Sequence, residues 1–341
     1  MITKNKKICF SEKGKVEFTE TAFNEKIEKP TEAIFRNLYS QVSAGTELAC
    51  LEGLEDWFPL PGTPGYTAVG EMIEKGAAVS HQTGKLYLTF GPHAQYFKID
   101  TSDRWKGVCV PVPDHLPGDI ASFAHLADIA MTAIRVSDIQ LGDWVAVTGM
   151  GPIGILAAQL AQLQGAWVIG IDINESRLEL AKKSGVKHVV NPSKNPREEI
   201  MRLTEGKGVH TCIEASGLAE TAEKAMKYIA QYGEMILLGT PRHAYHTDLT
   251  GFLRDIHLFY PSITIKGALE FIFPTHHTEF VKHSKERDCA ILMNLLKEER
   301  LNVKPFYTHK ANPEKAPEIY HGLRTKKDEY IGIVFDWTQI Q

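Results

Sequence analysis

The sequence lacks closely spaced cysteine pairs. Its five cysteines stand singly along 341 residues, and no two have the short spacing of a zinc ribbon or a redox motif. Isolated cysteines are typical of free thiols in a reducing compartment, so the sequence predicts a cytoplasmic protein. The first residues include lysines but no apolar run, and we therefore expect no signal peptide.

Long hydrophobic runs and basic blocks are also missing. No stretch approaches the roughly 18 apolar residues of a membrane-spanning helix, so we expect no membrane partner. Lys and Arg number 38 against 42 Asp and Glu, a net charge of −4. No basic block is long enough to follow a phosphate backbone, so we expect no nucleic-acid partner. A composition of 43% hydrophobic and 23% charged residues is ordinary for a globular protein.

The length predicts two domains, since about 100–200 residues make one. Roughly the first hundred residues contain short apolar runs between Gly/Pro turns, which is typical of a small barrel or sandwich. From Asp143 to Lys266, apolar strands alternate with amphipathic helices, the pattern of a parallel sheet covered on both faces. The sequence therefore predicts the α/β class, with a β-rich part preceding a doubly wound parallel sheet.

The strongest chemical signal is the turn after the strand Trp144–Thr148. It reads Gly149-Met150-Gly151-Pro152-Ile153-Gly154, the spacing G-x-G-x-x-G, and it opens a predicted helix. The first glycine allows a tight turn, the second lets the backbone approach a pyrophosphate, and the third lets helix and strand pack closely. The helix N-terminus offers free N–H groups to the phosphates. These six residues are predicted to bind a dinucleotide.

An acidic residue ends the next predicted strand. Asp172 follows Trp167–Ile171, 18 residues after Gly154. A carboxylate there accepts from the ribose hydroxyls and repels a 2′-phosphate, so the predicted cofactor is NAD rather than NADP. Ile173 and Arg177 complete this part of the predicted site. Arg177 weakens the discrimination if it turns toward the ribose.

Two later turns also follow predicted parallel strands. Ala215-Ser216-Gly217 comes after Val209–Ile213, and Gly239-Thr240 comes after Glu234–Leu238. Open α/β sheets bind ligands at the carboxyl ends of their strands, so these residues are predicted to contact the nicotinamide half. Tight strand-to-helix turns explain the same residues without a ligand.

Over nearly its full length the chain resembles the medium-chain dehydrogenase/reductase superfamily, of the alcohol and polyol dehydrogenase type. Val42–Glu47 resembles the loop bearing the first zinc ligand in that family, Pro64–Gly70 the second, and Ala121–Ala130 the helix bearing the third. The resemblance implies a GroES-like catalytic domain at residues 1–119 and 269–341, and a Rossmann domain at 120–268.

The zinc ligands themselves are replaced. Ala44 stands where zinc members have Cys, Tyr66 where they have His, and His125 where they have Glu, Cys or Asp. No cysteine lies between Cys50 and Cys109, so the four-cysteine structural zinc lobe is missing too. We expect no metal. Within the superfamily, the Ser43–Glu47 loop followed by Pro64-Gly65-Tyr66 looks most like a zinc-lacking branch that includes bacteriochlorophyllide dehydrogenase-like proteins.

Without zinc, a side chain must move the hydroxyl proton as the hydride leaves. The candidates lie at or beside the replaced ligand positions: His125, Thr46, Tyr66 and Glu47. His125 is the first choice, because imidazole takes up a proton near neutral pH. The alternatives are that Tyr66 is a packed aromatic residue, that Thr46 caps a loop, and that Glu47 forms a structural salt bridge.

The sequence thus favours a zinc-independent, NAD-dependent oxidoreductase acting on a secondary alcohol or polyol, or on the matching ketone. Two alternatives remain: an NAD(P)H-dependent quinone or enoyl reductase of the same superfamily, and an NAD-binding protein without catalysis. The resemblance also implies a homodimer formed through the last Rossmann strand, near Ile263–Gly267.

Overall fold

The computed structural model describes residues 4–340, and the chain forms two compact units. The first unit comprises Met1–His125 and Phe273–Gln341, and the second comprises Leu126–Ile272. The units divide a few residues beyond the predicted boundaries at 119/120 and 268/269. The chain leaves the first unit, builds the second, and returns, as the family resemblance implies.

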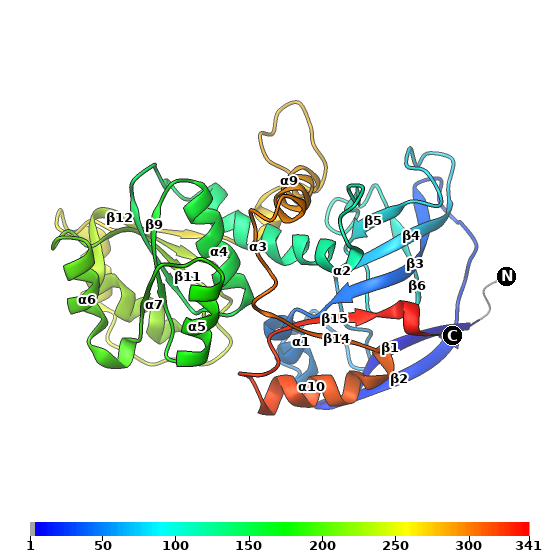
Figure 1. The fold of residues 1–341 in the computed structure, drawn as a ribbon, viewed down its shortest axis with the longest axis horizontal. Helices are drawn as coiled ribbons and strands as arrows, with labels where there is room; N and C mark the ends of the chain where they lie inside the picture. The colour runs from blue at the N-terminus through cyan, green and yellow to red at the C-terminus, as the bar shows by residue number, and fades with distance from the viewer. Residues whose placement is uncertain (1–3, 341) are drawn as a thin grey trace. The chain divides into compact units, whose positions relative to one another are not determined.

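A six-stranded sheet organises the second unit (Figure 1). Its order is β10-β9-β8-β11-β12-β13, and every pair is parallel. The strands are β8 (Trp144–Thr148), β9 (Trp167–Ile171), β10 (His188–Val190), β11 (Val209–Glu214), β12 (Ile229–Leu237) and β13 (Thr264–Gly267). Strands β9 and β10 lie on one side of β8, and β11, β12 and β13 lie on the other. This is the strand order of a Rossmann fold. The predicted parallel sheet is confirmed.

One helix of this unit begins at a side-chain cap. Asn174 precedes α5, and its side chain accepts from Ser176 N at 2.8 Å. The helices are α3 (Phe123–Val136, which crosses the unit boundary), α4 (Pro152–Leu163), α5 (Glu175–Lys183), α6 (Pro196–Leu203), α7 (Ala219–Ala225) and α8 (Thr250–His257). After α7, a 3-10 turn (Met226–Tyr228) leads directly into β12, whose first residue, Ile229, pairs with Val209.

A seven-stranded sheet forms the centre of the first unit. Its path is β14-β15-β3-β4-β5-β7, with β6 beside β3. The strands are β3 (Glu32–Gln41), β4 (Ala68–Lys75), β5 (Leu86–Thr89), β6 (Tyr96–Asp100), β7 (Cys109–Pro111), β14 (Tyr307–Ala311) and β15 (Gly332–Asp336). Figure 1 shows the red strand β15 alongside the blue strand β3. The C-terminal segment therefore completes a sheet begun by the N-terminal one.

A hairpin and four helices complete the first unit. The hairpin is β1 (Lys4–Glu12) with β2 (Lys15–Ala22), and the helices are α1 (Ala44–Leu51), α2 (Gly118–Ala121), α9 (Lys285–Lys297) and α10 (Ala316–Thr325). The segment expected as the first-ligand loop is thus helical from Ala44 onward. Its apolar residues, including Cys50 and Leu51, pack into the core with α10.

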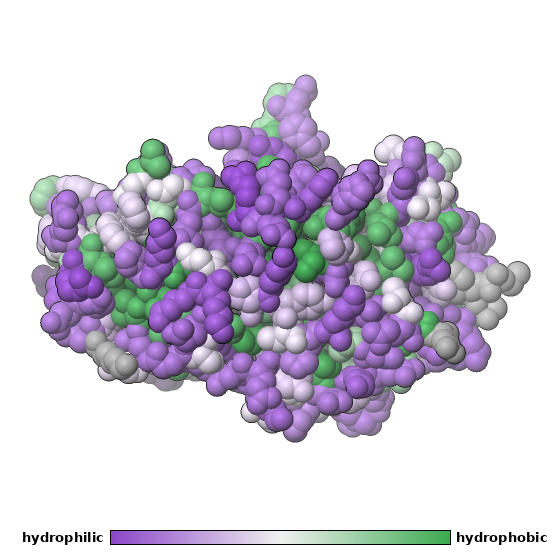
Figure 2. Space-filling model, in the orientation of Figure 1, coloured by the Kyte–Doolittle hydropathy of each residue, from purple (hydrophilic) through white to green (hydrophobic). Residues whose placement is uncertain are grey.

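Apolar side chains fill the interior of each unit. The face seen in Figure 2 is largely hydrophilic, with apolar residues in separate small patches. Within residues 4–340, no helix combines the length and the apolar character needed to cross a bilayer.

Candidate functional site

The glycine turn after β8 has the geometry of a phosphate cradle. Gly149 has φ +87°, and a Cβ on Gly154 would lie 1.7 Å from Gly149 O, so neither position accepts a side chain. A Cβ on Gly151 would meet nothing within 4 Å, which leaves open space above that backbone. Pro152 then begins α4, whose first N–H groups have no partner inside the helix. The turn and the helix start fit a pyrophosphate.

Asp172 is tied to this turn. Its Oδ2 accepts from Met150 N at 2.7 Å, and its Oδ1 accepts from Asn174 N at 2.8 Å. Nη1 of Arg177 lies 3.9 Å from the same Oδ2. Ile173, the next residue, is 73% exposed. The residue predicted to bind the ribose is therefore held beside the predicted phosphate turn.

The two later turns meet the first one at the carboxyl edge of the sheet. A Cβ on Gly149 would lie 2.9 Å from Ser216 Cα, and a Cβ on Gly239 would lie 2.3 Å from Gly217 N. Gly217 has φ +69°, and a Cβ there would lie 2.8 Å from Thr240 O. Ala215 N donates to Thr148 O at 2.9 Å. The fold thus brings the predicted cofactor residues of three separate turns together.

Glu214, which the sequence analysis did not single out, organises the second of these turns. It is buried, and its carboxyl accepts from Ser216 N at 2.9 Å, Gly217 N at 3.0 Å and the hydroxyl of Ser216. Burial raises the pKa of Glu214, while the hydrogen bonds of Ser216, Gly217 and Thr148 oppose that shift. Its place at the last position of an apolar strand was the available signal.

His125 lies in the first turn of α3 and is fully buried. Its Nδ1 is 2.9 Å from Tyr66 O and 2.8 Å from Thr67 Oγ1. A carbonyl oxygen can only accept, so Nδ1 carries the proton and, in the neutral ring, the lone pair is on Nε2. The ring stacks on Phe90 with centroids 3.5 Å apart.

Tyr66 and Thr46 are both half-buried. The Tyr66 ring meets that of His125 edge-on, with centroids 5.3 Å apart, and it is half-buried. Thr46 is half-buried in the first turn of α1. Tyr66 thus lies against His125, whereas Thr46 comes from a different element of the same unit.

Glu47 points into the protein. It is 1% exposed, and its carboxyl accepts from Ser43 N at 2.7 Å, His93 Nε2 at 3.0 Å and the Tyr320 hydroxyl. Burial raises the pKa of Tyr320 well above its usual value, and the neighbouring Glu47 raises it further. These contacts favour an anchoring role for Glu47 over proton transfer. Thr67 was not predicted as a site residue.

Two of the three positions that resemble the family's zinc-ligand positions hold residues that are not usual zinc ligands. Ala44 offers only a methyl group, and Tyr66 offers a phenol. Across the described residues, 4–340, no group of three or more His, Cys, Asp or Glu side chains is arranged to hold a metal.

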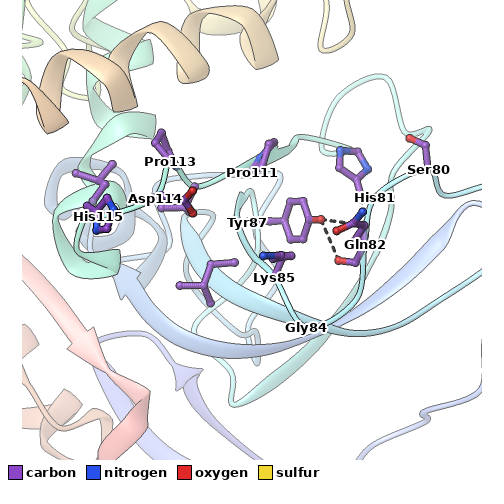
Figure 3. A pocket seen from close by; sticks show the side chains of 13 residues that line it. Ser80, His81, Gln82, Gly84, Lys85, Tyr87, Pro111, Pro113, Asp114 and His115 are labelled. Carbon is purple, nitrogen blue, oxygen red and sulfur yellow. Dashed lines mark hydrogen bonds between the residues drawn. The ribbon is translucent and has the colours of Figure 1, made fainter.

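A separate pocket of about 540 Å³ lies in the first unit, between the 80–87 segment and the 111–116 segment (Figure 3). The hydroxyl of Tyr87 donates to Gln82 O and accepts from Gln82 N, both at 2.9 Å, which fixes one wall. None of the predicted catalytic or cofactor residues lines this pocket.

Comparisons with known proteins agree with this architecture. The family model described as zinc-binding dehydrogenase matches residues 152–277. An uncharacterized zinc-type alcohol dehydrogenase-like protein of Haemophilus influenzae is 26% identical over 295 residues, covering 78% of this chain and 85% of that protein. L-threonine 3-dehydrogenase of Bacillus licheniformis is 28% identical over 239 residues, covering 69% of this chain and 62% of that enzyme.

The fold is also that of solved dehydrogenases. Galactitol-1-phosphate dehydrogenase of Escherichia coli superposes with a TM-score of 0.84 at 18% identity, covering 97% of this chain and 99% of that chain. Its likeness extends over both units, whereas the family model covers the dinucleotide-binding part. Taken with the glycine turn and the strand order, these similarities show that the chain resembles the medium-chain dehydrogenase/reductase superfamily and shares the fold of its alcohol dehydrogenase-like members.

Proposed function

We propose that this protein is a zinc-independent, NAD-dependent oxidoreductase of a secondary alcohol or polyol, or of the matching ketone. The observation that carries the proposal is the position of His125, the one basic side chain among the four residues proposed for proton transfer. Its Nδ1 lies 2.9 Å from Tyr66 O, and its ring lies edge-on to that of Tyr66; we assign to its imidazole the acceptance of a proton from a substrate hydroxyl.

The proposed roles are cofactor binding and proton transfer. The 149–154 turn, Asp172 and the 215–217 and 239–240 turns hold the dinucleotide. When bound, NAD accepts a hydride from the alcohol carbon. His125 takes the hydroxyl proton, so the C–H electron pair leaves as hydride and the carbonyl forms. Tyr66 and Thr46 orient the substrate oxygen through their hydroxyl groups.

The preference for NAD rests on Asp172. Its carboxylate lies beside the phosphate turn, where it accepts from ribose hydroxyls and repels a 2′-phosphate. The substrate class rests on the relatives named above, since one acts on L-threonine at carbon 3 and the other on galactitol 1-phosphate, both hydroxylated compounds. We also propose a cytoplasmic location, because all five cysteines are free thiols.

The decisive variant is His125→Asn. Asparagine keeps a donor for Tyr66 O but lacks a basic nitrogen, so kcat should fall about 10²–10⁴-fold while the Kd for NADH stays unchanged. His321→Asn, an exposed histidine of the same unit, is the control. Full turnover by His125→Asn would remove the proton acceptor from the proposal.

Substrate panels and metal analysis test the other parts. Wild-type enzyme should turn over polyols or secondary alcohols with NAD, should keep its activity in EDTA, and should contain no stoichiometric zinc. One equivalent of bound zinc would contradict the metal-free mechanism. Quinone reduction with NADPH would favour the reductase alternative, and NADH binding without any turnover would favour a binding protein.

We further propose a homodimer formed through β13. This strand ends the six-stranded sheet, with β12 as its neighbour, so its outer edge is available for pairing with a second copy. Light scattering should give twice the 38.1 kDa chain mass. A monomer would overturn this proposal and leave the chemistry of the site unaffected.

A further inference from the structure

His93 is a completely buried histidine in the connection between β5 and β6. Its Nε2 lies 3.0 Å from Glu47 Oε2, its Nδ1 lies 2.7 Å from Ser40 Oγ, and its backbone N–H donates to Pro64 O at 2.8 Å. It therefore contacts three segments that are distant in the sequence.

The contacts of this network continue from His93 to the C-terminal segment. The indole of Trp337 only donates, and its Nε1 lies 2.7 Å from Ser40 Oγ, so Ser40 accepts there. The same Ser40 oxygen lies 2.7 Å from Nδ1 of His93, and Nε2 of His93 lies 3.0 Å from Glu47 Oε2. A chain of contacts therefore links Trp337 to Glu47 through Ser40 and His93.

The network holds both segments that carry the proposed catalytic hydroxyl groups. Thr46 directly precedes Glu47, so anchoring Glu47 fixes the first turn of α1. On the other side, a Cβ on Gly65 would lie 2.7 Å from His93 Cγ, so the loop backbone rests directly on the imidazole. The next residue, Tyr66, provides the carbonyl that accepts from His125.

We propose that His93 is a positioning residue for the reaction assigned above, an inference that rests on the proposed function. By holding Glu47 and the Pro64–Gly65 backbone at once, His93 sets Thr46, Tyr66 and the Tyr66 carbonyl in place for His125. The two histidines together join α1, the 64–67 loop and α3 by hydrogen bonds. His93 itself contacts no substrate.

Two substitutions separate positioning from packing. His93→Phe keeps an aromatic ring but removes both side-chain hydrogen bonds, and His93→Gln keeps a donor for Glu47 and an acceptor for Ser40. His93→Phe should lower kcat about 10–100-fold with little change in KM or in the Kd for NADH, since small displacements of reacting groups cost this much. His93→Gln should recover most of the loss.

The matched control is Tyr87→Phe. It removes the two hydrogen bonds to Gln82 from a buried phenol of the same sheet (Figure 3), and it should lower the Tm without lowering kcat. If His93→Phe behaves like this control, His93 is only structural and the proposal is wrong. If His93→Phe does not fold, Ser40→Ala tests the same role, because it removes the partner of Nδ1 together with the acceptor of the Trp337 indole, and Trp337→Phe, which removes only the indole donor, is its control.

A readout independent of turnover completes the experiment. Side-chain ¹⁵N NMR, with the His125 signals assigned from the His125→Asn spectrum, reports the His125 tautomer. We expect a single Nδ1–H tautomer in the wild type, a mixture in His93→Phe, and the wild-type pattern in His93→Gln. Unchanged His125 signals in His93→Phe would overturn the positioning role. Absence of turnover in the wild type would count against the proposed function alone.

Discussion

The carboxylate of Asp172 accepts a hydrogen bond of 2.7 Å from the backbone N–H of Met150, the second residue of the glycine turn. The residue proposed to select the cofactor therefore also fixes the turn proposed to receive its phosphates. A charge-assisted hydrogen bond of this length is among the stronger kinds in proteins. Changes at Asp172 should consequently affect both the affinity and the selectivity for the dinucleotide.

Asp172→Ala removes the anchor of the turn and the ribose acceptor together. We expect the Kd for NADH to rise about 10–100-fold, because a hydrogen bond to a charged group contributes about 1.5–3 kcal/mol. Asp172→Asn keeps one acceptor for Met150 and should lose less. Fluorescence titration with NADH measures both, and Asp143→Asn, at the opposite end of β8, is the control. Equal affinities in all four proteins would contradict the role of Asp172.

Arg177 should become a phosphate ligand once Asp172 is gone. Its Nη1 lies 3.9 Å from Asp172 Oδ2. If the carboxylate is removed, a 2′-phosphate on the ribose would supply the negative charge that Arg177 loses. Asp172→Ser should therefore shift the Kd ratio toward NADPH, and adding Arg177→Ala should cancel that shift. The four ratios form a double-mutant cycle. A shift that persists without Arg177 would assign the phosphate contact elsewhere.

Tyr66→Phe distinguishes donation from packing. The ring lies edge-on to His125, and phenylalanine keeps that contact while losing the hydroxyl. If the hydroxyl orients the substrate oxygen, kcat should fall about tenfold or more at an unchanged Tm. Initial rates of ketone reduction and thermal unfolding give the two numbers. A drop in Tm at constant kcat would identify Tyr66 as a packing residue.

Glu214 should make stability depend on pH. Burial raises its pKa in the folded protein, so the folded state binds the proton more tightly than the unfolded chain. Its contribution is fully present below the unfolded pKa of about 4.3 and is lost as pH rises through the raised folded value. The difference in unfolding free energy between wild type and Glu214→Gln, from urea titrations, should therefore decrease with pH across this window. A constant difference would contradict the linkage.

Much of the proposed dinucleotide site could be predicted from the order of residues along the chain. A strand, a G-x-G-x-x-G turn, a helix and an acid after the next strand are local features, and parallel strands bring their carboxyl ends to one edge. Residues 149–154, Asp172 and the 215–217 and 239–240 turns therefore lie together, as predicted. The role of Glu214 in holding the 215–217 turn was decided only by the tertiary structure, because its position at the end of an apolar strand does not by itself show which backbone N–H groups its carboxyl will accept from.

The contacts of the proposed catalytic residues could not be predicted from the sequence. The family resemblance indicated that Ala44 and Tyr66 stand at zinc-ligand positions and that His125 is the basic group at the third. Only the tertiary structure determined that Glu47 turns inward to His93 and Tyr320, and that His125 bonds to the Tyr66 carbonyl. These partners lie 46, 273 and 59 residues away along the chain. A hydrogen bond depends on distance and direction in space, and these are set only when β3, the 64–67 loop and the C-terminal segment pack together.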